Sequence, residues 1–266
     1  MLDTILNINP DRIAVTELFG AIGSPQRTTE FIRMLRAIED NAKVRALVID
    51  IDSPGGAAGP SEYIYSSVAK IAKKKPVVAF IRGIGASGGY MVACGATKVV
   101  AVPMALVGSI GVISQRPMVQ EMFEKLGVRM ETRKAGRLKD MFSMFREPTA
   151  EETQREQTLL DSFYDRFVAL VAAERDLPVE RVRELATGEV FTADEAKQSG
   201  LIDDLGDLDV AIDLAQSLAE LPERKVSYVK PHRGLRDRLL NNAAMAVVEA
   251  FESAIETRLQ AGRLRY

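Results

Sequence analysis

The sequence has one histidine and one cysteine among its 266 residues. A single cysteine excludes an internal disulfide framework and any zinc site built from several cysteines, so we expect Cys94 to fill a core position. The one histidine, His232, lies in the polar stretch 230–234, where we expect a connector. An enzyme of this composition therefore needs a base other than imidazole to activate a nucleophile, and a desolvated lysine amine can serve.

Long apolar runs are also missing. No segment contains the about 18 consecutive apolar residues that a membrane-spanning helix requires. The first residues, Met1–Thr4, lack the basic and then apolar order of a secretion signal. From these absences we expect neither a spanning segment nor an export signal in this sequence, and a protein that is cytoplasmic or peripheral to a membrane.

The charges show no excess of one sign. The 35 basic and 37 acidic residues are interspersed, which argues against a nucleic-acid groove and against an acidic tail. Hydrophobic residues make up 47% of the chain, enough to bury a sizeable core. We therefore expect one compact catalytic domain with short appendages, and no nucleic-acid partner.

The first two thirds of the chain alternate short β-rich runs with helical patterns. The expected pairs of strand and helix are 12–15 with 28–38, 44–52 with 61–72, 76–81 with a helix that begins near Ser87, and 98–102 with 119–126. Runs such as 77–81 show little alternation of apolar and polar residues, as in strands that helices cover on both faces. The pattern predicts an α/β fold with a mainly parallel sheet flanked by helices.

Two helical patterns dominate the last third. Thr149 and Glu152 form a capping box that opens a long helix, and a stripe of apolar residues at helical spacing predicts that one side of this helix packs in the core. The stripe consists of Leu159, Leu160, Phe163, Phe167, Leu170 and Val171. Residues 235–259 are apolar on one helical side and flanked by arginines, which predicts an amphipathic C-terminal helix. Such a helix packs on its own domain or a neighbouring subunit, or lies on an anionic membrane surface.

Ser87 is the candidate nucleophile because of its glycine-rich surroundings, Gly85-Ala86-Ser87-Gly88-Gly89-Tyr90. It follows a strand that we expect to end near Arg82, and it stands at the first turn of the next helix, where backbone amides have no partner. The amide of Gly88 can donate to the oxyanion that forms when Ser87 attacks a carbonyl. A second glycine turn, Gly55-Gly56, follows the strand 47–52 at the same sheet edge, so both glycines are candidates for the second donor. Each turn alone is equally compatible with a tight strand-to-helix connection.

Other interpretations of these residues fit less well. Residues 83–88 match G-x-G-x-x-G, but the next strand, 98–102, ends without the acidic residue of a dinucleotide site. Residues 85–89 match the G-x-S-x-G of α/β-hydrolase esterases, for which His232 is the one available imidazole. Asp50 and Asp52 share a strand face without histidines or further clustered acids, so we expect no metal site and no cofactor.

Several motifs in chain order resemble the signal peptide peptidase A family of serine peptidases. They are Asp52-Ser53-Pro54-Gly55-Gly56, Ala86-Ser87-Gly88-Gly89-Tyr90, Val107-Gly108-Ser109-Ile110-Gly111-Val112, Lys139-Asp140, Val190-Phe191-Thr192 and Gly200-Leu201-Ile202-Asp203. The similarity runs from about residue 12 to residue 206. It implies a crotonase-like, ClpP-like spiral fold and a Ser-Lys catalytic dyad.

Carried to this sequence, the resemblance implies that Ser87 is the nucleophile and Lys139 the general base, 139 − 87 = 52 residues apart. Ser109 would orient the lysine amine, and Gly88 with the Gly55-Gly56 turn would form the oxyanion hole. A lysine can accept a proton at neutral pH only if burial lowers its pKa from about 10.4 to roughly 7 to 8. Nothing but the resemblance singles out Lys139 from the cationic stretch 133–139.

The resemblance and the helical patterns together predict a domain organisation and partners. Residues 1–10 form an N-terminal lead, 11–231 the crotonase-like serine peptidase domain, and 232–266 the C-terminal amphipathic helix. The expected activity is cleavage of unstructured apolar peptides such as signal-peptide remnants, in a homo-oligomeric ring whose subunits jointly build the active sites, with peripheral membrane contact through the C-terminal helix. An esterase that uses His232, an acyl-CoA enzyme on the same fold and an inactive scaffold are the alternatives.

Overall fold

The structure is a computed structural model, and it describes residues 11–231. The N-terminal lead, residues 1–10, and the C-terminal amphipathic helix, residues 232–266, lie outside the described residues, so both remain predictions. Within residues 11–231, no helix combines the length and the hydropathy that crossing a membrane requires.

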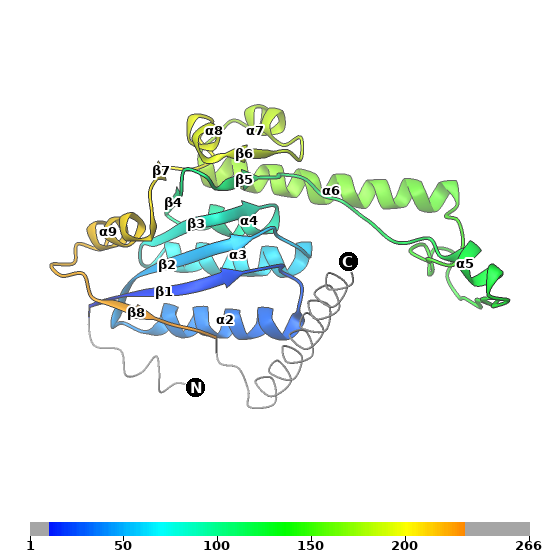
Figure 1. Cartoon of the computed structure of the whole chain (residues 1–266), viewed down its shortest axis with the longest axis horizontal. Helices are drawn as coiled ribbons and strands as arrows, with labels where there is room; N and C mark the ends of the chain where they lie inside the picture. The colour runs from blue at the N-terminus through cyan, green and yellow to red at the C-terminus, as the bar shows by residue number, and fades with distance from the viewer. Residues whose placement is uncertain (1–10, 232–266) are drawn as a thin grey trace, which may run out of the picture.

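Strands and helices alternate along the described chain as the sequence predicts (Figure 1). In order they are β1 (Arg12–Phe19), α2 (Pro25–Asp40), β2 (Val44–Ser53), α3 (Ala58–Ala72), β3 (Val77–Ala86), α4 (Gly88–Cys94), β4 (Lys98–Ala101), β5 (Leu106–Gly108), α5 (Gln120–Lys125), α6 (Ala150–Arg175), α7 (Val179–Leu185), β6 (Val190–Thr192), α8 (Ala193–Gln198), β7 (Asp204–Leu205), α9 (Leu208–Leu218) and β8 (Val226–Tyr228).

The sheet is mainly parallel, which confirms the prediction. Its order is β6-β5-β3-β2-β1-β8, and β4 and β7 lie off this path. The pairs β1·β2, β2·β3, β3·β4, β3·β5, β1·β8 and β4·β7 are parallel, whereas β5·β6 is antiparallel. Because parallel strands end at a common edge, the turns after β2 and β3 lie side by side.

Strand β3 divides one of its edges between two partners. Its first half pairs with β4 and its last residues, Ile84–Ala86, pair with β5. The strand therefore continues four residues past Arg82, where the sequence predicted its end, and that prediction was wrong. Gly83 and Gly85 lie inside a strand and not in a turn, so residues 83–88 do not form the turn of a dinucleotide site.

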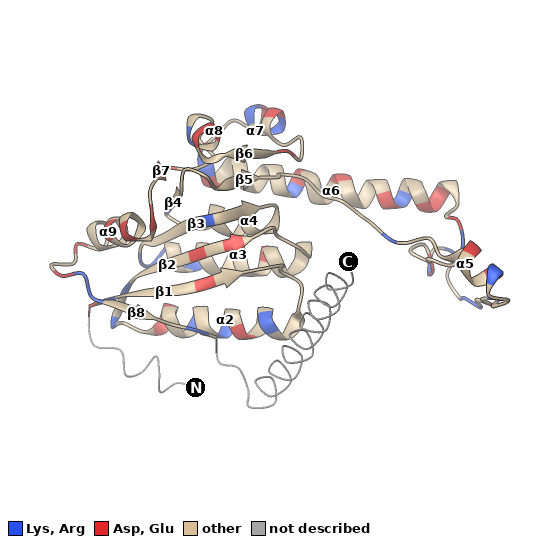
Figure 2. Cartoon of the chain, viewed as in Figure 1, with Lys and Arg blue, Asp and Glu red and all other residues tan. Residues whose placement is uncertain are grey.

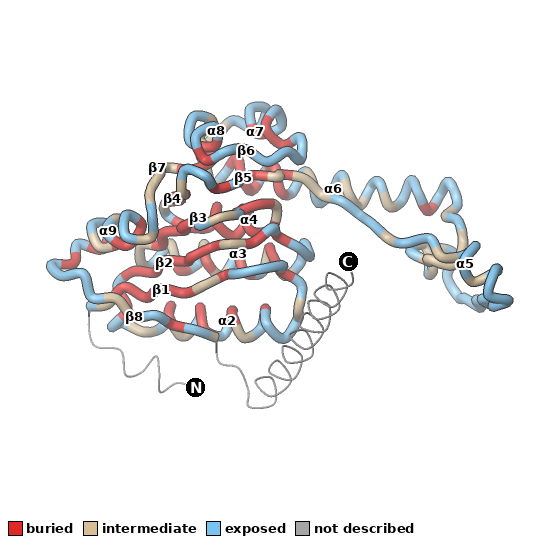
Figure 3. Tube along the Cα trace, in the orientation of Figure 1, coloured by how far each residue is buried: buried red, intermediate tan, exposed pale blue. Residues whose placement is uncertain are grey.

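Two apolar layers cover the sheet. Helices α2, α3 and α4 and the C-terminal half of α6 pack on one face, and their core includes Leu35, Ile49, Ile64, Val92 and Val168. Helix α9 covers the other face at the N-terminal ends of the strands, where Val48, Phe80 and Ile212 are buried. Figure 3 shows the resulting contrast between a buried sheet and exposed outer segments.

The arm, residues 114–149, leaves the body after β5, contains α5 and returns to the start of α6 (Figure 1). Arg116 holds it to α6 through an ion pair with Glu156 at 2.9 Å, and Phe123 packs edge-on against Phe145 with ring centroids 5.3 Å apart. The arm exposes large apolar side chains, namely Met118, Met122, Leu126, Val128, Met130 and Phe142.

The capping box of α6 is confirmed, since Glu152 N donates to Thr149 Oγ1 and Thr149 N donates to Glu152 Oε2. The apolar stripe is confirmed only in the C-terminal half, where Phe167, Leu170 and Val171 are buried. Leu159 and Leu160 are half-buried and Phe163 is 49% exposed. The physical reason is that the N-terminal half of α6 extends beyond the sheet together with the arm (Figures 1 and 3).

Candidate active site

Ser87 occupies a strained turn between β3 and α4. Its φ of 49° and ψ of −122° are unusual for a residue with a side chain. Two contacts hold the turn in place, since Ser87 N donates to Gly108 O at 2.7 Å and Met91 N donates to Ser87 O at 2.8 Å. A strained serine that is held from both sides and faces a cavity is a candidate nucleophile.

The helix that follows Ser87 can approach its neighbours only because it begins with glycine. A Cβ on Gly88 would lie 2.2 Å from Ser61 Oγ, and a Cβ on Gly55 would lie 2.5 Å from Gly88 N. Helix α4 is further fixed by Tyr90, a fully buried residue whose hydroxyl donates to Leu201 O at 2.7 Å. The two glycine turns predicted at this sheet edge are therefore in van der Waals contact.

Ser87 lines a cavity of about 740 Å³. Ser109, Gly55, Gly56 and Gly88 line the same cavity, so the structure brings five of the six predicted site residues together. Apolar side chains make up much of the remaining wall, namely Met91, Val112, Ile113, Phe163 and Phe167. The sequence pattern assigns none of these side chains to a site. It places Phe163 in the core stripe of the long helix, whereas the structure leaves this side chain 49% exposed at the cavity, as in residues that contact a ligand.

The two glycines of the second turn differ in their hydrogen bonds. Gly55 N donates to Ser53 Oγ at 3.2 Å, and that hydroxyl in turn donates to Gly20 O at 2.7 Å. Among the hydrogen bonds of the described residues, none is donated by the amide of Gly56 or of Gly88. Gly56 is therefore a better candidate than Gly55 for the second amide that faces an oxyanion.

Loop 20–24 supports the Gly55-Gly56 turn from behind. Ile22 N donates to Gly55 O at 2.8 Å and Ala57 N donates to Ile22 O at 2.7 Å. A Cβ on Gly56 would lie 1.9 Å from Ile22 O. The turn therefore tolerates no side chain at position 56.

Ser109 follows β5 and has a φ of 48°. Its amide donates to Glu189 O at 2.7 Å, and its hydroxyl donates to Gly188 O at 3.2 Å. Ser87 and Ser109 come from adjacent strands, because Ala86 pairs with Gly108. A hydroxyl at this place can turn toward an amine that enters the cavity.

Lys139 does not line the cavity of Ser87 in the same chain. It is exposed and lies on the arm, whose neighbouring residue Arg137 pairs with Glu151 in the first turn of α6. Phe163 is the first residue of α6 that lines the cavity, and it lies eleven positions after Glu152, or about 16 Å along the helix axis. Within one chain the predicted dyad is therefore not assembled.

Charged groups surround the turn that carries Lys139. Hydrogen bonds from Arg146 and Lys134 lower the pKa of Asp140 below its usual range. Arg146 and the Thr149 amide lower the pKa of Glu152 to about 2. Both carboxylates are thus charged at neutral pH, and α6 itself carries residues of both signs along its length (Figure 2).

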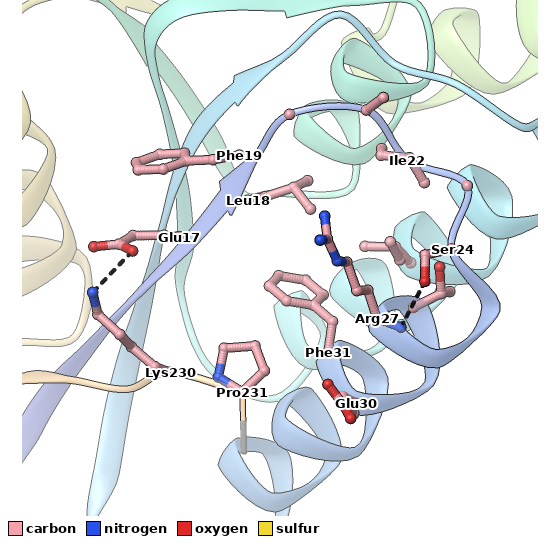
Figure 4. A pocket seen from close by; sticks show the side chains of 15 residues that line it. Glu17, Leu18, Phe19, Ile22, Ser24, Arg27, Glu30, Phe31, Lys230 and Pro231 are labelled. Carbon is pink, nitrogen blue, oxygen red and sulfur yellow. Dashed lines mark hydrogen bonds and ion pairs between the residues drawn. The ribbon is translucent and has the colours of Figure 1, made fainter. Parts of the chain in front are cut away.

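A second hollow of about 410 Å³ lies on the far side of loop 20–24, between the end of β1 and the start of α2 (Figure 4). Leu18, Ile22 and Phe31 line it, and Arg27 reaches over it. None of the site residues predicted from the sequence lies there. His232, which the esterase alternative requires, lies outside the described residues.

Asp50 and Asp52 have local partners. Asp50 is nearly buried and forms an ion pair with Arg82, while Asp52 Oδ1 accepts a hydrogen bond from Ile84 N at 3.0 Å. Both carboxylates therefore have structural partners on the neighbouring strand, β3.

Comparison with known proteins gives consistent matches. The family model described as peptidase family S49 matches residues 69–222. A Synechocystis protein that bears the name of a protease is 40% identical over 215 residues, which are 81% of this chain and 77% of the relative. Serine protease SPPA, chloroplastic, of Arabidopsis thaliana is 33% identical over 84% of this chain, and Protease 4 of Salmonella typhi is 34% identical over 82%. The chain spans 35% of the length of each of these last two relatives.

Among solved structures, the 1510-N membrane-bound stomatin-specific protease is similar to this chain with a TM-score of 0.54. The match covers 84% of this chain and 99% of that one at 18% sequence identity. At this level of identity the similarity concerns the fold, and it agrees with the α/β architecture described above.

Proposed function

The chain belongs to peptidase family S49, and from this premise we propose that it is a serine endopeptidase that cleaves unstructured apolar peptides, signal-peptide remnants among them. The observation that carries the proposal is Ser87, which occupies a strained turn and lines a largely apolar cavity together with Gly56 and Gly88, whose amides donate no hydrogen bond within residues 11–231. Peptidase names recur among the relatives, including Serine protease SPPA and Protease 4.

In the proposed reaction, the neutral amine of Lys139 takes the proton of Ser87 Oγ while Oγ bonds to the scissile carbonyl carbon. The amides of Gly88 and Gly56 donate to the oxyanion. The lysine ammonium then gives its proton to the nitrogen of the departing peptide as the C–N bond breaks. Water, deprotonated by the same lysine, hydrolyses the ester on Ser87. Ser109 orients the amine through its hydroxyl, and the reaction uses no metal or cofactor.

We place Lys139 of one subunit at Ser87 of a neighbouring subunit in a homo-oligomeric ring. Two features support this arrangement. The turn that carries Lys139 is bound to the first turn of α6, which lies about 16 Å along the helix axis from the cavity of its own chain. In addition, the arm exposes apolar side chains that a partner can bury. Burial against that partner would also remove water from the lysine amine, which favours the neutral form that a base requires.

The substrate class follows from the cavity wall. Met91, Val112 and Phe163 offer apolar contacts, and Arg166 and Glu62 pair with each other at 2.7 Å and so present little net charge. An extended peptide would use backbone hydrogen bonds for affinity and place small or apolar side chains in the cavity.

The decisive test is cleavage of a fluorogenic apolar peptide by the wild-type chain, Ser87→Ala, Lys139→Ala and His232→Ala, with mass spectrometry to trap the acyl-enzyme. We expect both dyad variants to lose activity by at least about 1,000-fold, and the histidine variant to keep it. An acyl adduct should form on Ser87 alone. Full activity in Lys139→Ala, or loss in His232→Ala, would contradict the dyad, and coenzyme A binding with an inert Ser87 would favour an acyl-CoA enzyme.

A further inference from the structure

Helix α6 connects the two halves of the proposed site. Its C-terminal half is anchored in the core through Phe167 and Val168 and lines the cavity of Ser87. Its first turn, which begins at Ala150, supports the part of the arm that carries Lys139. An α-helix is stiff over this length, so whatever is fixed to its first turn keeps a defined place relative to the body.

A network of three side chains fixes the Lys139 turn to that helix end. Arg146 is its centre: Nη1 and Nη2 donate to the two carboxylate oxygens of Glu152, and the Nη1 contact measures 2.8 Å. Nε of the same guanidinium donates to Asp140 Oδ2 at 3.0 Å, and Nη2 reaches Asp140 O at 3.3 Å. Arg146 therefore bridges the start of α6 to the residue that follows Lys139. We call Asp140, Arg146 and Glu152 the clamp.

Further contacts tighten the clamp at both ends. The Glu152 side chain is only 2% exposed, and it also closes the capping box with Thr149. The second oxygen of Asp140 accepts from Lys134, whose side chain is about one third exposed. Between these ends the backbone turns tightly, since Lys139 N donates to Gly136 O at 3.1 Å and Ser143 N donates to Asp140 O at 2.9 Å.

The clamp differs from the ion pair between Asp165 of α6 and Arg183 of α7. Arg183 and Asp165 form a single contact with both side chains about half exposed, and pairs of this kind contribute little to stability. In the clamp one guanidinium serves two carboxylates, one of them nearly buried. The cost of desolvation offsets much of the electrostatic gain in such a network, while its several directed hydrogen bonds restrict how the joined groups can be arranged.

We propose that Asp140, Arg146 and Glu152 are positioning residues that set the place of Lys139 relative to α6, and so its reach into the neighbouring subunit's active site. The inference rests on the proposed function, in which Lys139 is the base. A base must lie within hydrogen-bond distance of the nucleophile, and displacement by about 1 Å can lower the rate by about 100-fold.

The kinetic test compares Asp140→Asn, Arg146→Lys and Glu152→Gln with the matched control Asp165→Asn, which breaks the ion pair to Arg183 elsewhere on α6. For each clamp variant we expect kcat to fall by about 10- to 100-fold while KM stays within about twofold, in rings that remain assembled and at a temperature below the unfolding midpoint of every variant. Asp165→Asn should leave both constants within about twofold. Because Asp140 and Glu152 act through one arginine, the double variant Asp140→Asn/Glu152→Gln should lose little more than either single variant.

A second measurement reports position without activity. Spin labels at Lys139→Cys and at the exposed Gln157→Cys, in a Cys94→Ala background, give the distribution of distances between the arm turn and α6 by pulsed electron resonance. We expect this distribution to be narrow, to at least double in width with Asp140→Asn, and to stay narrow with Asp165→Asn.

The possible outcomes distinguish the positioning role of the clamp from the role of Lys139 as the base. Full kcat in assembled clamp variants, an unchanged distance distribution, or activity lost only together with ring assembly would each overturn the positioning role. If Lys139→Ala remains active in the same assay while Asp140→Asn broadens the distance distribution, the base assignment fails and the clamp stands as a structural device alone.

Discussion

At the scale of single residues, Gly56 has the least room for a side chain among the glycines of residues 11–231. It has a φ of 152°, and a Cβ there would lie 1.9 Å from Ile22 O. We predict that Gly56→Ala shifts the turn whose amide donates to the oxyanion in the proposed reaction, and lowers kcat by about 100-fold, the scale of losing one oxyanion donor. Stability should fall by roughly 1 to 3 kcal/mol because the backbone is strained. Peptide cleavage and chemical unfolding measure the two effects.

Gly59 supplies the control, because it lies at the start of α3 and a Cβ added there would meet nothing within 4 Å. Gly59→Ala should keep full activity and gain roughly 0.5 to 1 kcal/mol from helix propensity. Unchanged kcat in Gly56→Ala would show that the Gly55-Gly56 turn has no part in catalysis.

Local sequence pattern predicts site residues where the chemistry depends on the backbone. The positions of Ser87 and Gly88 follow from a strand, a glycine turn and a helix in succession, and the structure has that order. The choice between Gly55 and Gly56 could not be made this way, because it depends on a hydrogen bond from Gly55 N to Ser53 Oγ that only the folded loop forms. The cavity wall, with Phe163 and Val112, is assembled from distant segments and has no local signal.

At the scale of elements, α6 is one helix with two environments. Both Phe163 and Phe167 line the cavity, but Phe167 is 2% exposed and packs in the core, whereas Phe163, one turn earlier, is 49% exposed. We predict that Phe167→Ala lowers the free energy of unfolding by about 3 to 5 kcal/mol, and that Phe163→Ala changes it by less than about 0.5 kcal/mol. Phe163→Ala should instead raise KM for apolar peptides several-fold, as measured by steady-state kinetics.

The two variants serve as controls for each other, since both remove a phenyl ring from the same helix. Equal losses of stability would mean that Phe163 is packed against the body and that the N-terminal half of α6 does not project. An unchanged KM in Phe163→Ala would remove this side chain from the substrate contacts.

Periodicity predicts elements well and their surroundings less well. The order of strands and helices, the parallel sheet and the capping box at Thr149 are all readable from propensity and spacing. The prediction that the apolar stripe of α6 is buried is wrong at Phe163, because helical spacing indicates which side of a helix is apolar but not which other element packs on it. The prediction that β3 ends near Arg82 is wrong, because the last residues of the strand pair with β5, which comes later in the chain.

At the scale of the whole molecule, the arm separates the residues that the proposed reaction must bring together. The described chain holds Ser87 and Ser109 in one cavity and carries Lys139 on a clamped turn beyond it. The apolar side chains along the arm, Met122 and Leu126 among them, are exposed in the single chain. A neighbouring subunit that covers them would supply both the missing apolar contact and the missing cavity.

This arrangement predicts complementation between inactive variants. In a ring where each site takes Ser87 from one subunit and Lys139 from its neighbour, a random equal mixture of Ser87→Ala and Lys139→Ala subunits rebuilds about a quarter of the sites, one half multiplied by one half. We expect about a quarter of wild-type cleavage after subunit exchange, with native mass spectrometry to confirm mixed rings. Ser87→Ala mixed with the Ser87→Ala/Lys139→Ala double variant contains no intact serine and must stay inactive. If confirmed mixed rings of Ser87→Ala and Lys139→Ala subunits cleaved no peptide, each subunit would have to supply both dyad residues. The arm would then have to fold back onto the cavity of its own chain.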